Sequence, residues 1–593
     1  MRILFFLLFF TSSLVYSQNY DAALAEEYFK NGEFEKALIS YKKLYKNNSS
    51  SLTYIYKLVR THQQLEQYKE VDTFLKALIQ NKNYPPLTIE LGYNYALQND
   101  SITANTYYNK AISTIKDTPG YASTIGRTFE NLSLLDHAIT AYTTAMEVNP
   151  EFNFNMQLAR IYGEQGDIKN MFTKYIEFGA ENTTYLNNIK REFSTFISED
   201  KDQENNKILR LILLKKIQES PDVLWNEMLS WLFIQQKEYN KAFAQEKAIY
   251  KREMESLDRI EELAKIAFNQ KENDIAKSIF TYIIDNTQNL DLKINAHYNI
   301  LNIKTQEATT KEYDAIAQEY EQLLSEYGGL LSALDLKIAY GHFLAFYLKQ
   351  TDKAIAFLKD TLKSNASKQK IAEIKLELGD ILVLEEKFNE ALIYYTQIQR
   401  SLKNSTIAQE ARFKVAKTSY YKGDFKWAES QLKVLQASTS QLTANDALDL
   451  KLLIGDNKLE DSLQLGLKRY AKADLLQFQN RNDEAIALLN DILNQHQSEA
   501  IIPQALLKQA QLFEIKKQYD KALVNYQRII TEYSDGILAD DAIYGMALVY
   551  DRYLDQPEKA KSYYENLLFN HQDSIFFVEA RKRFRALRGD AIQ

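Results

Sequence analysis

The chain has 593 residues, of which 45% are hydrophobic, 25% charged and 12% aromatic, and its formal net charge is −7. The 72 Lys and Arg residues are outnumbered by 79 Asp and Glu residues, so no basic excess points to nucleic acid or to an anionic membrane surface. Only 17 glycines and 7 prolines accompany 40 tyrosines, a balance typical of packed helices and unlike that of disordered or turn-rich β proteins.

The N-terminal residues have the layout of a secretory signal peptide. Arg2 precedes an apolar run over residues 3–10, and a looser stretch ends at Ser17. We therefore expect export with cleavage after Ser17, which makes residues 1–17 the signal peptide. A retained membrane anchor is the alternative, but an anchor needs about 20 apolar residues and this run is interrupted at Thr11.

Cysteine is absent, so we expect neither disulfides nor a cysteine-linked lipid anchor. No second apolar stretch approaches the length of a transmembrane helix, and we expect no transmembrane segment in the mature chain.

One segment, residues 121–150, carries a pattern of small and aromatic residues that recurs along the chain. Its members are Gly126, Phe129, Ala138, Tyr142 and Ala145, and the segment closes at Pro150. This order resembles the tetratricopeptide repeat, a pair of antiparallel helices. The resemblance implies that the small residues lie where the two helices press together and that Phe129 and Tyr142 fill the space between them.

The pattern recurs at the period of that repeat. The small residues of the second helices are Ala37, Val71, Ala104, Ala138 and Met171 in the first part of the chain, at intervals of 33 or 34 residues. Towards the C-terminus they are Ala354, Ala391, Ala428, Ala485, Ala522 and Ala560, at intervals of 37 or 38 residues apart from a longer gap after Ala428.

These spacings predict an all-α, right-handed superhelical solenoid of about 14 to 15 helix pairs. We divide it into a regular N-terminal array over 18–180, an irregular middle array over 181–365 and a C-terminal array over 366–593. Inserted helices are expected near 445–466, and a basic helix over 575–588 is expected to cap the solenoid, with docking to an acidic partner or to lipid head groups as the alternative. The segments YQRIITEYSDGILADDA and YENLLFNHQDSIFFVEARKRF also resemble the repeats of BamD-type outer-membrane assembly proteins and of related periplasmic coordinators.

Signatures of catalysis are missing from the sequence. The six histidines are scattered without an HExxH pair, and neither a G-x-S-x-G motif nor a glycine-rich phosphate loop occurs. We therefore expect no enzyme, no metal and no cofactor.

The register of the repeat places a row of arginines and tyrosines on the first helices of the N-terminal array. The row consists of Tyr56, Arg60, Tyr93, Arg127 and Arg160. Guanidinium groups bind carboxylates and tyrosines add stiff contact area, so the row predicts a groove for a peptide with acidic groups or a free carboxyl end. The alternative, which the pattern favours, is that these arginines pair with carboxylates of the array such as Glu26 and Glu130.

The function we expect is that of an exported, non-catalytic scaffold or adaptor that joins proteins in the bacterial periplasm, in envelope or outer-membrane protein biogenesis or secretion. The resemblances imply partners among outer-membrane or periplasmic proteins, and outer-membrane association through such a partner. The alternative is a periplasmic glycan or peptidoglycan-binding protein, which would present exposed rings, and Trp225, Trp231 and Trp427 are the candidates.

Overall fold

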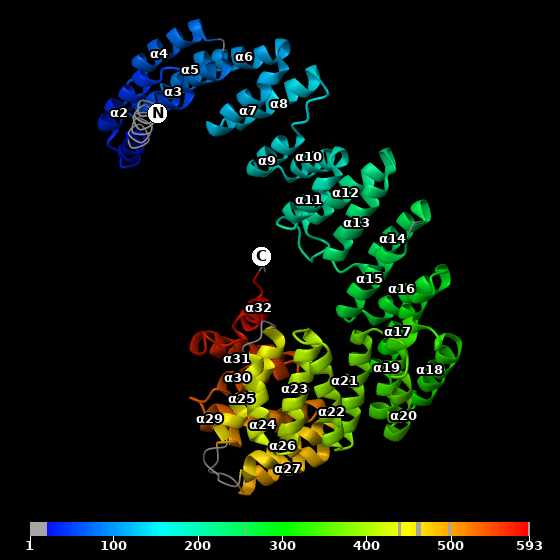
Figure 1. The fold of residues 1–593 in the computed structure, drawn as a ribbon. Coiled ribbons are helices and arrows are strands. Elements are labelled where there is room, and N and C mark those ends of the chain that lie inside the picture. Colours follow the sequence, from blue (N-terminus) through cyan, green and yellow to red (C-terminus); the bar gives the residue numbers. More distant parts are fainter. Residues whose placement is uncertain are drawn as a thin grey trace, which may run out of the picture. The chain divides into compact units, whose positions relative to one another are not determined.

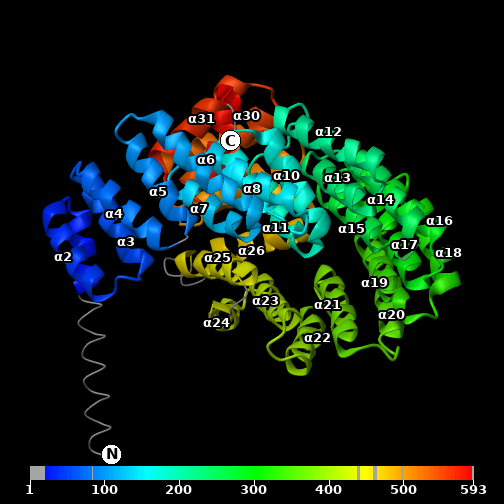
Figure 2. The ribbon, with the colours of Figure 1, turned by 90° about the horizontal axis from the view of Figure 1, so that it is seen from above.

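The computed structural model describes residues 21–82, 84–254, 256–436, 441–457, 464–495 and 500–590. Across these residues all regular structure is helical, which confirms the all-α class (Figures 1 and 2). The expected signal peptide and its cleavage site lie outside them. Among the described helices, none is both long and apolar enough to cross a bilayer.

The chain separates into two compact units, Met1–Ser256 and Leu257–Gln593. The three segments expected from the sequence follow the regularity of the repeat rather than compactness, and they stay a prediction. In the first unit, helical residues 21–30 are followed by α2 (Phe34–Asn47), α3 (Leu52–Gln64), α4 (Tyr68–Asn81), α5 (Pro85–Ala96), α6 (Ser101–Asp117), η1 (Pro119–Tyr121), α7 (Ala122–Asn131), α8 (Leu135–Val148), α9 (Asn155–Glu164), α10 (Ile168–Glu181), η2 (Thr183–Tyr185), α11 (Leu186–Phe193), α12 (Glu204–Glu219), α13 (Val223–Gln235) and α14 (Tyr239–Glu253).

The second unit continues the series of helix pairs. Its elements are α15 (Asp258–Asn269), α16 (Asn273–Asn286), α17 (Leu290–Glu307), α18 (Tyr313–Tyr327), η3 (Leu331–Ala333), α19 (Leu334–His342), η4 (Phe343–Tyr347), α20 (Thr351–Thr361), α21 (Lys368–Leu384), α22 (Phe388–Ser401), α23 (Thr406–Tyr421), α24 (Phe425–Gln436), α25 (Gln441–Asn457), α26 (Leu465–Phe478), α27 (Asn482–Gln495), α28 (Ile502–Ile515), α29 (Tyr519–Glu532), α30 (Ala539–Arg552), α31 (Pro557–Asn570) and α32 (Phe577–Arg588).

A left-handed residue ends the first helix of most pairs. The amide after it donates back to a carbonyl near the end of that helix, for example from Gln67 to His62 at 2.9 Å and from Gln518 to Phe513 at 2.8 Å. The left-handed residues are Gly32, Glu66, Asn99, Ser133, Gly166, Lys237, Lys271, Lys349, Glu386, Gly423, Asn480, Lys517 and Asp555. Their intervals are 33 or 34 residues early and 37 or 38 residues late, as for the small residues, apart from longer gaps after Gly166, Lys271 and Gly423.

Small residues let the paired helices approach each other closely. Ala138 is fully buried, and a Cβ atom at Gly126 would collide with the ring of Tyr142, which lies directly on the glycine. The Tyr142 hydroxyl donates to Glu130 of the preceding helix. In the second unit the Tyr395 ring lies on Gly379 in the same way, and its hydroxyl donates to Asp380 Oδ1 at 2.6 Å.

The segment expected to hold inserted helices contains α25, and α26 then returns to earlier repeats. Gln479 Nε2 donates to the Leu384 carbonyl at 3.0 Å, and Lys472 lies 2.7 Å from Glu386. Residues more than 80 positions apart in the chain are therefore in contact within the second unit. At the end of the chain, α32 packs through the buried Ala580.

Candidate peptide-binding sites

The predicted groove of the first unit contains an arginine that is already paired. Arg60 lies 2.9 Å from Glu90 and donates to Gln63 at 2.8 Å, and its guanidinium lies 5.0 Å from the centre of the Tyr93 ring. Glu90 is only 3% exposed, and its burial raises its pKa although Arg60 opposes the shift. Arg60 and Tyr93 border a pocket of about 420 Å³. Arg60 therefore forms an ion pair with a residue of the array itself.

Arg127 and Arg160 have a different environment. They lie on α7 and α9, the first helices of consecutive pairs, and both side chains are exposed. Within the described part of the chain neither forms an ion pair, although the Arg160 guanidinium approaches Met156 Sδ at 3.9 Å and the Tyr175 hydroxyl. These two guanidinium groups are the part of the predicted row that remains available to a partner.

The carboxylates expected to neutralise these arginines have other partners. Glu26 pairs with Lys57 and accepts from the Tyr41 hydroxyl, while Glu130 accepts from Tyr142. Tyr56, the remaining member of the row, is half-buried, and burial beside Tyr84 raises its pKa.

The candidate rings for glycan binding are mostly occupied by packing. Trp225 is buried, and its indole nitrogen donates to the Ser220 carbonyl at 3.0 Å. Trp231 is half-buried against Phe193, with ring centres 6.5 Å apart. Trp427, on α24, is 50% exposed. These positions do not supply the row of exposed platforms that glycan binding would use.

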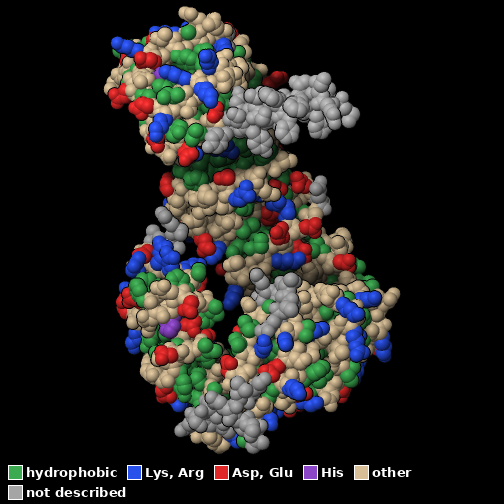
Figure 3. Space-filling view, turned by 60° about the vertical axis from the view of Figure 1, so that its left-hand side comes forward, with side chains coloured by type: hydrophobic (Ala, Val, Ile, Leu, Met, Phe, Trp, Pro, Cys, Tyr) green, Lys and Arg blue, Asp and Glu red, His purple; other side chains and the backbone are tan. Residues whose placement is uncertain are grey.

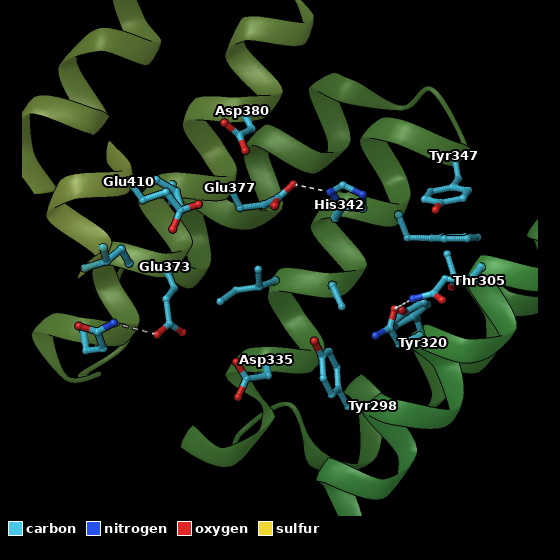
Figure 4. Close-up of a pocket in the computed structure, with 18 of the residues that line it drawn as sticks. Tyr298, Thr305, Tyr320, Asp335, His342, Tyr347, Glu373, Glu377, Asp380 and Glu410 are labelled. Atoms are coloured by element: carbon cyan, nitrogen blue, oxygen red, sulfur yellow. Dashed lines mark hydrogen bonds and ion pairs between the residues drawn. The ribbon is translucent and has the colours of Figure 1, made fainter. Parts of the chain in front are cut away.

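A second pocket, which was not predicted from the sequence, lies in the second unit. It has a volume of about 680 Å³ and is bordered by α17, α18, α19, η4, α21 and α23. Figure 4 shows its carboxylates together on one side, and Thr305 with three tyrosines on the other. The carboxylates are Asp335, Glu373, Glu377, Asp380 and Glu410. We call this cavity the acidic pocket.

Most of these carboxylates belong to a ladder of contacts between consecutive first helices. Lys370 lies 2.5 Å from Asp335 and 2.7 Å from Glu373, and Lys414 lies 2.6 Å from Asp380. His342 Nδ1 lies 2.9 Å from Glu377 Oε1. Each contact except that within α21 joins residues 34 or 35 positions apart, so the ladder follows the repeat.

Glu410 stands outside the ladder. It forms no ion pair within the described residues, and desolvation by the surrounding walls raises its pKa even though Lys414 acts in the opposite direction. Glu410 is exposed, and Lys414, the cation that acts on it, is paired with Asp380, so the Glu410 carboxylate has no ion pair of its own among the described residues.

Neutral polar groups complete the pocket. Asn302, Gln306 and Gln369 supply amides, and Tyr298 supplies a phenol. Thr305 is only 8% exposed, and its Oγ1 has no hydrogen-bond partner; the Tyr320 hydroxyl lies nearby without completing a hydrogen bond. No cluster of three or more potential metal ligands occurs among the described residues, so the pocket carboxylates are spread out rather than convergent.

Two features of the sequence could have indicated the acidic pocket. Glu373, Glu377 and Asp380 follow each other at helical spacing on one face of α21, and Glu410 follows Glu373 at the 37-residue interval of this part of the chain. The register of first-helix positions was recognised only in the first five repeats, where the interval is shorter.

Comparison with known proteins identifies the repeat in the C-terminal part. Two family models, both described as tetratricopeptide repeat, match residues 470–537 and 541–574. The chain therefore carries tetratricopeptide repeats over these residues, as predicted. The resemblance to BamD-type proteins stays a prediction.

Solved structures align along nearly the whole chain but at low similarity. The APC/C hetero-tetramer Cut9–Hcn1 aligns over 96% of each chain with 12% identity and a TM-score of 0.25. The complex of Naa15/Naa10 bound to HypK-THB aligns over 97% of each chain with 11% identity and a TM-score of 0.29. No curated protein sequence matches the chain significantly.

Proposed function

We propose that the protein is an exported, non-catalytic scaffold that holds other proteins together in the bacterial periplasm, in envelope or outer-membrane protein biogenesis. The tetratricopeptide repeats at residues 470–574 support protein binding as its general role. The signal-peptide layout of residues 1–17 supports export, and the sequence resemblance to BamD-type repeats supports the envelope.

The proposal depends on Arg127 and Arg160, which are exposed and form no ion pair with a described residue. Two exposed guanidinium groups on consecutive first helices, without carboxylate partners of their own, fit an acidic segment or a free carboxyl end of a partner. Arg60 is left out of this site because Glu90 already neutralises it.

The test is capture of partners from the intact envelope. We would cross-link cells that express the tagged protein, purify it and compare the recovered proteins with those of the variant Arg127→Glu/Arg160→Glu. Loss of the main partner by about tenfold or more is expected, because the reversed charges repel an acidic segment.

A matched control is Lys69→Glu/Lys110→Glu, which reverses two exposed charges on the second helices α4 and α6 of the same unit. It should retain the partner. Equal capture by both variants would move the site away from the arginines. Recovery of full-length protein from the cytoplasm, with Met1 intact, would refute export.

A further inference from the structure

We infer that the acidic pocket of the second unit binds an extended basic segment of a partner protein, at a site separate from the arginines of the first unit. The lining contributes five carboxylates, whereas the cations bound to them are Lys370 and Lys414, with His342 as a further partner. The pocket therefore keeps a negative balance after its internal pairs are counted.

The negative charge of the pocket that has no ion pair lies on Glu410. It is the one pocket carboxylate for which no ion pair exists among the described residues, and it projects from α23 towards the others (Figure 4). A Lys or Arg side chain of a ligand would give it the direct ion pair that no described residue of the array provides. Such charge-assisted hydrogen bonds are about twice as strong as neutral ones.

The arrangement of the acids favours a polymer over a single ion. The carboxylates come from three successive first helices, α19, α21 and α23, and no three of the described ligand-type residues converge on one point. A divalent metal needs converging oxygens, whereas cationic side chains spaced along a peptide can meet separate carboxylates.

The neutral lining suits a peptide backbone. Asn302, Gln306 and Gln369 offer amide donors and acceptors, and the buried Thr305 hydroxyl is unpaired at the same wall. Tyr298 and Tyr347 add aromatic surface against which the aliphatic stem of a Lys or Arg can lie. The pocket thus offers carboxylates to the charged ends of a basic segment, aromatic rings to its aliphatic stems and amides to its backbone.

The test is a binding titration with the full mature chain. A short fluorescein-labelled peptide of alternating Lys and Ala is followed by fluorescence anisotropy, beside a peptide in which Glu replaces Lys. We expect the Lys peptide to bind, the Glu peptide not to bind, and affinity to fall as salt is added. Glu410→Gln should weaken binding several-fold and Glu410→Lys by about tenfold or more.

The matched control is Glu390→Lys, an equal charge change at an exposed position on the second helix α22. It should bind the Lys peptide as the unchanged protein does. Arg127→Glu/Arg160→Glu should also bind it normally, which separates this site from the one in the first unit. Because Glu410 is exposed and forms no ion pair among the described residues, Glu410→Gln should melt at the same temperature as the unchanged protein.

Four results would overturn the inference. These are undiminished binding by Glu410→Lys, an equal loss in Glu390→Lys, similar binding of both peptides, and displacement of the Lys peptide by an equal concentration of spermidine. The last result would assign the pocket to small polyamines instead of a protein segment.

Discussion

Gly126 has no side chain, and this absence gives the Tyr142 ring its place on helix α7. The ring covers the glycine, and its hydroxyl reaches Glu130 one turn further along the same helix. Burial acts first to raise the pKa of Tyr142, and the Glu130 contact adds to the shift, so the phenol remains a donor at neutral pH. A single position thereby fixes the distance between two helices and satisfies a buried polar group.

Replacing Gly126 by alanine should lower stability, whereas replacing a helical glycine that has open space beside it should raise stability. Gly126→Ala places a Cβ within the Tyr142 ring and should destabilise the pair by about 1–3 kcal/mol, despite the better helix propensity of alanine. Gly455→Ala, in α25 with no atom within 4 Å of the new Cβ, should stabilise its helix by up to about 1 kcal/mol.

Backbone amide exchange can measure each change locally, which matters because a long repeat array does not unfold in two states. Exchange should accelerate in α7 and α8 for Gly126→Ala and slow in α25 for Gly455→Ala. Unchanged exchange in α7 and α8 would show that the ring moves aside freely.

At the scale of the elements, the sequence predicted the helix pairs because small residues mark them. Ala37 and Ala138 recur at a period that survives in the structure as fully buried contacts. The turns within the pairs gave less signal, since residues such as Lys237 and Lys517 take the left-handed conformation that glycine would mark. There the hydrogen bond that closes the turn and the packing of the pair outweigh the cost of that conformation.

The acidic pocket was not predicted from the sequence because the repeat pattern is irregular in one of its walls. One wall of the pocket is formed by α19, which continues into a π-helical turn, η4 (Phe343–Tyr347). The left-handed residue that leads to the second helix of this pair follows at Lys349. That irregular stretch lacks a recognisable first-helix signature, so the positions of α19 that face the acidic pocket could not be assigned from the sequence. In the first unit the row of arginines was placed by the register, but the pairing of Arg60 with a buried Glu90 depends on tertiary packing.

A buried carboxylate holds α26 between two other first helices. Asp474 is 8% exposed and lies 2.5 Å from Lys417 of α23 and 3.1 Å from Lys508 of α28. Burial alone would raise the pKa of Asp474, but the two lysines outweigh it and hold the pKa below its ordinary value. The ion pairs therefore stabilise the fold above the pKa of the unfolded chain, and this contribution is lost as pH falls through the lower pKa of the folded state.

Asp474→Asn should loosen α26, because it leaves two partly buried ammonium groups without their shared counter-charge. We expect a cost of about 1–3 kcal/mol, seen as faster amide exchange in α26 at neutral pH. Asp446→Asn, at an exposed position of α25, provides the control and should leave exchange unchanged. Equal protection of α26 in both variants would mean that apolar packing alone holds it.

At the scale of the whole molecule, the two compact units carry candidate surfaces of opposite charge. Arg127 and Arg160 belong to the first unit, and the acidic pocket belongs to the second. If both proposals hold, one chain can bind an acidic segment and a basic segment of its partners at the same time.

The division into units predicts which fragments fold. Residues 257–593 produced alone should remain helical and keep the acidic pocket, because their packing is largely internal and a repeat array loses only one neighbour contact when it is cut between pairs. Residues 257–436 should be much less stable, since they lack α26, whose Leu475 belongs to the core around α21 and whose Asp474 binds Lys417. Circular dichroism during thermal unfolding compares the two fragments, and titration with the Lys peptide then reports on the pocket. Equal melting of both fragments would show that the return of α26 contributes little, whereas loss of helix in residues 257–593 would show that the second unit depends on the first.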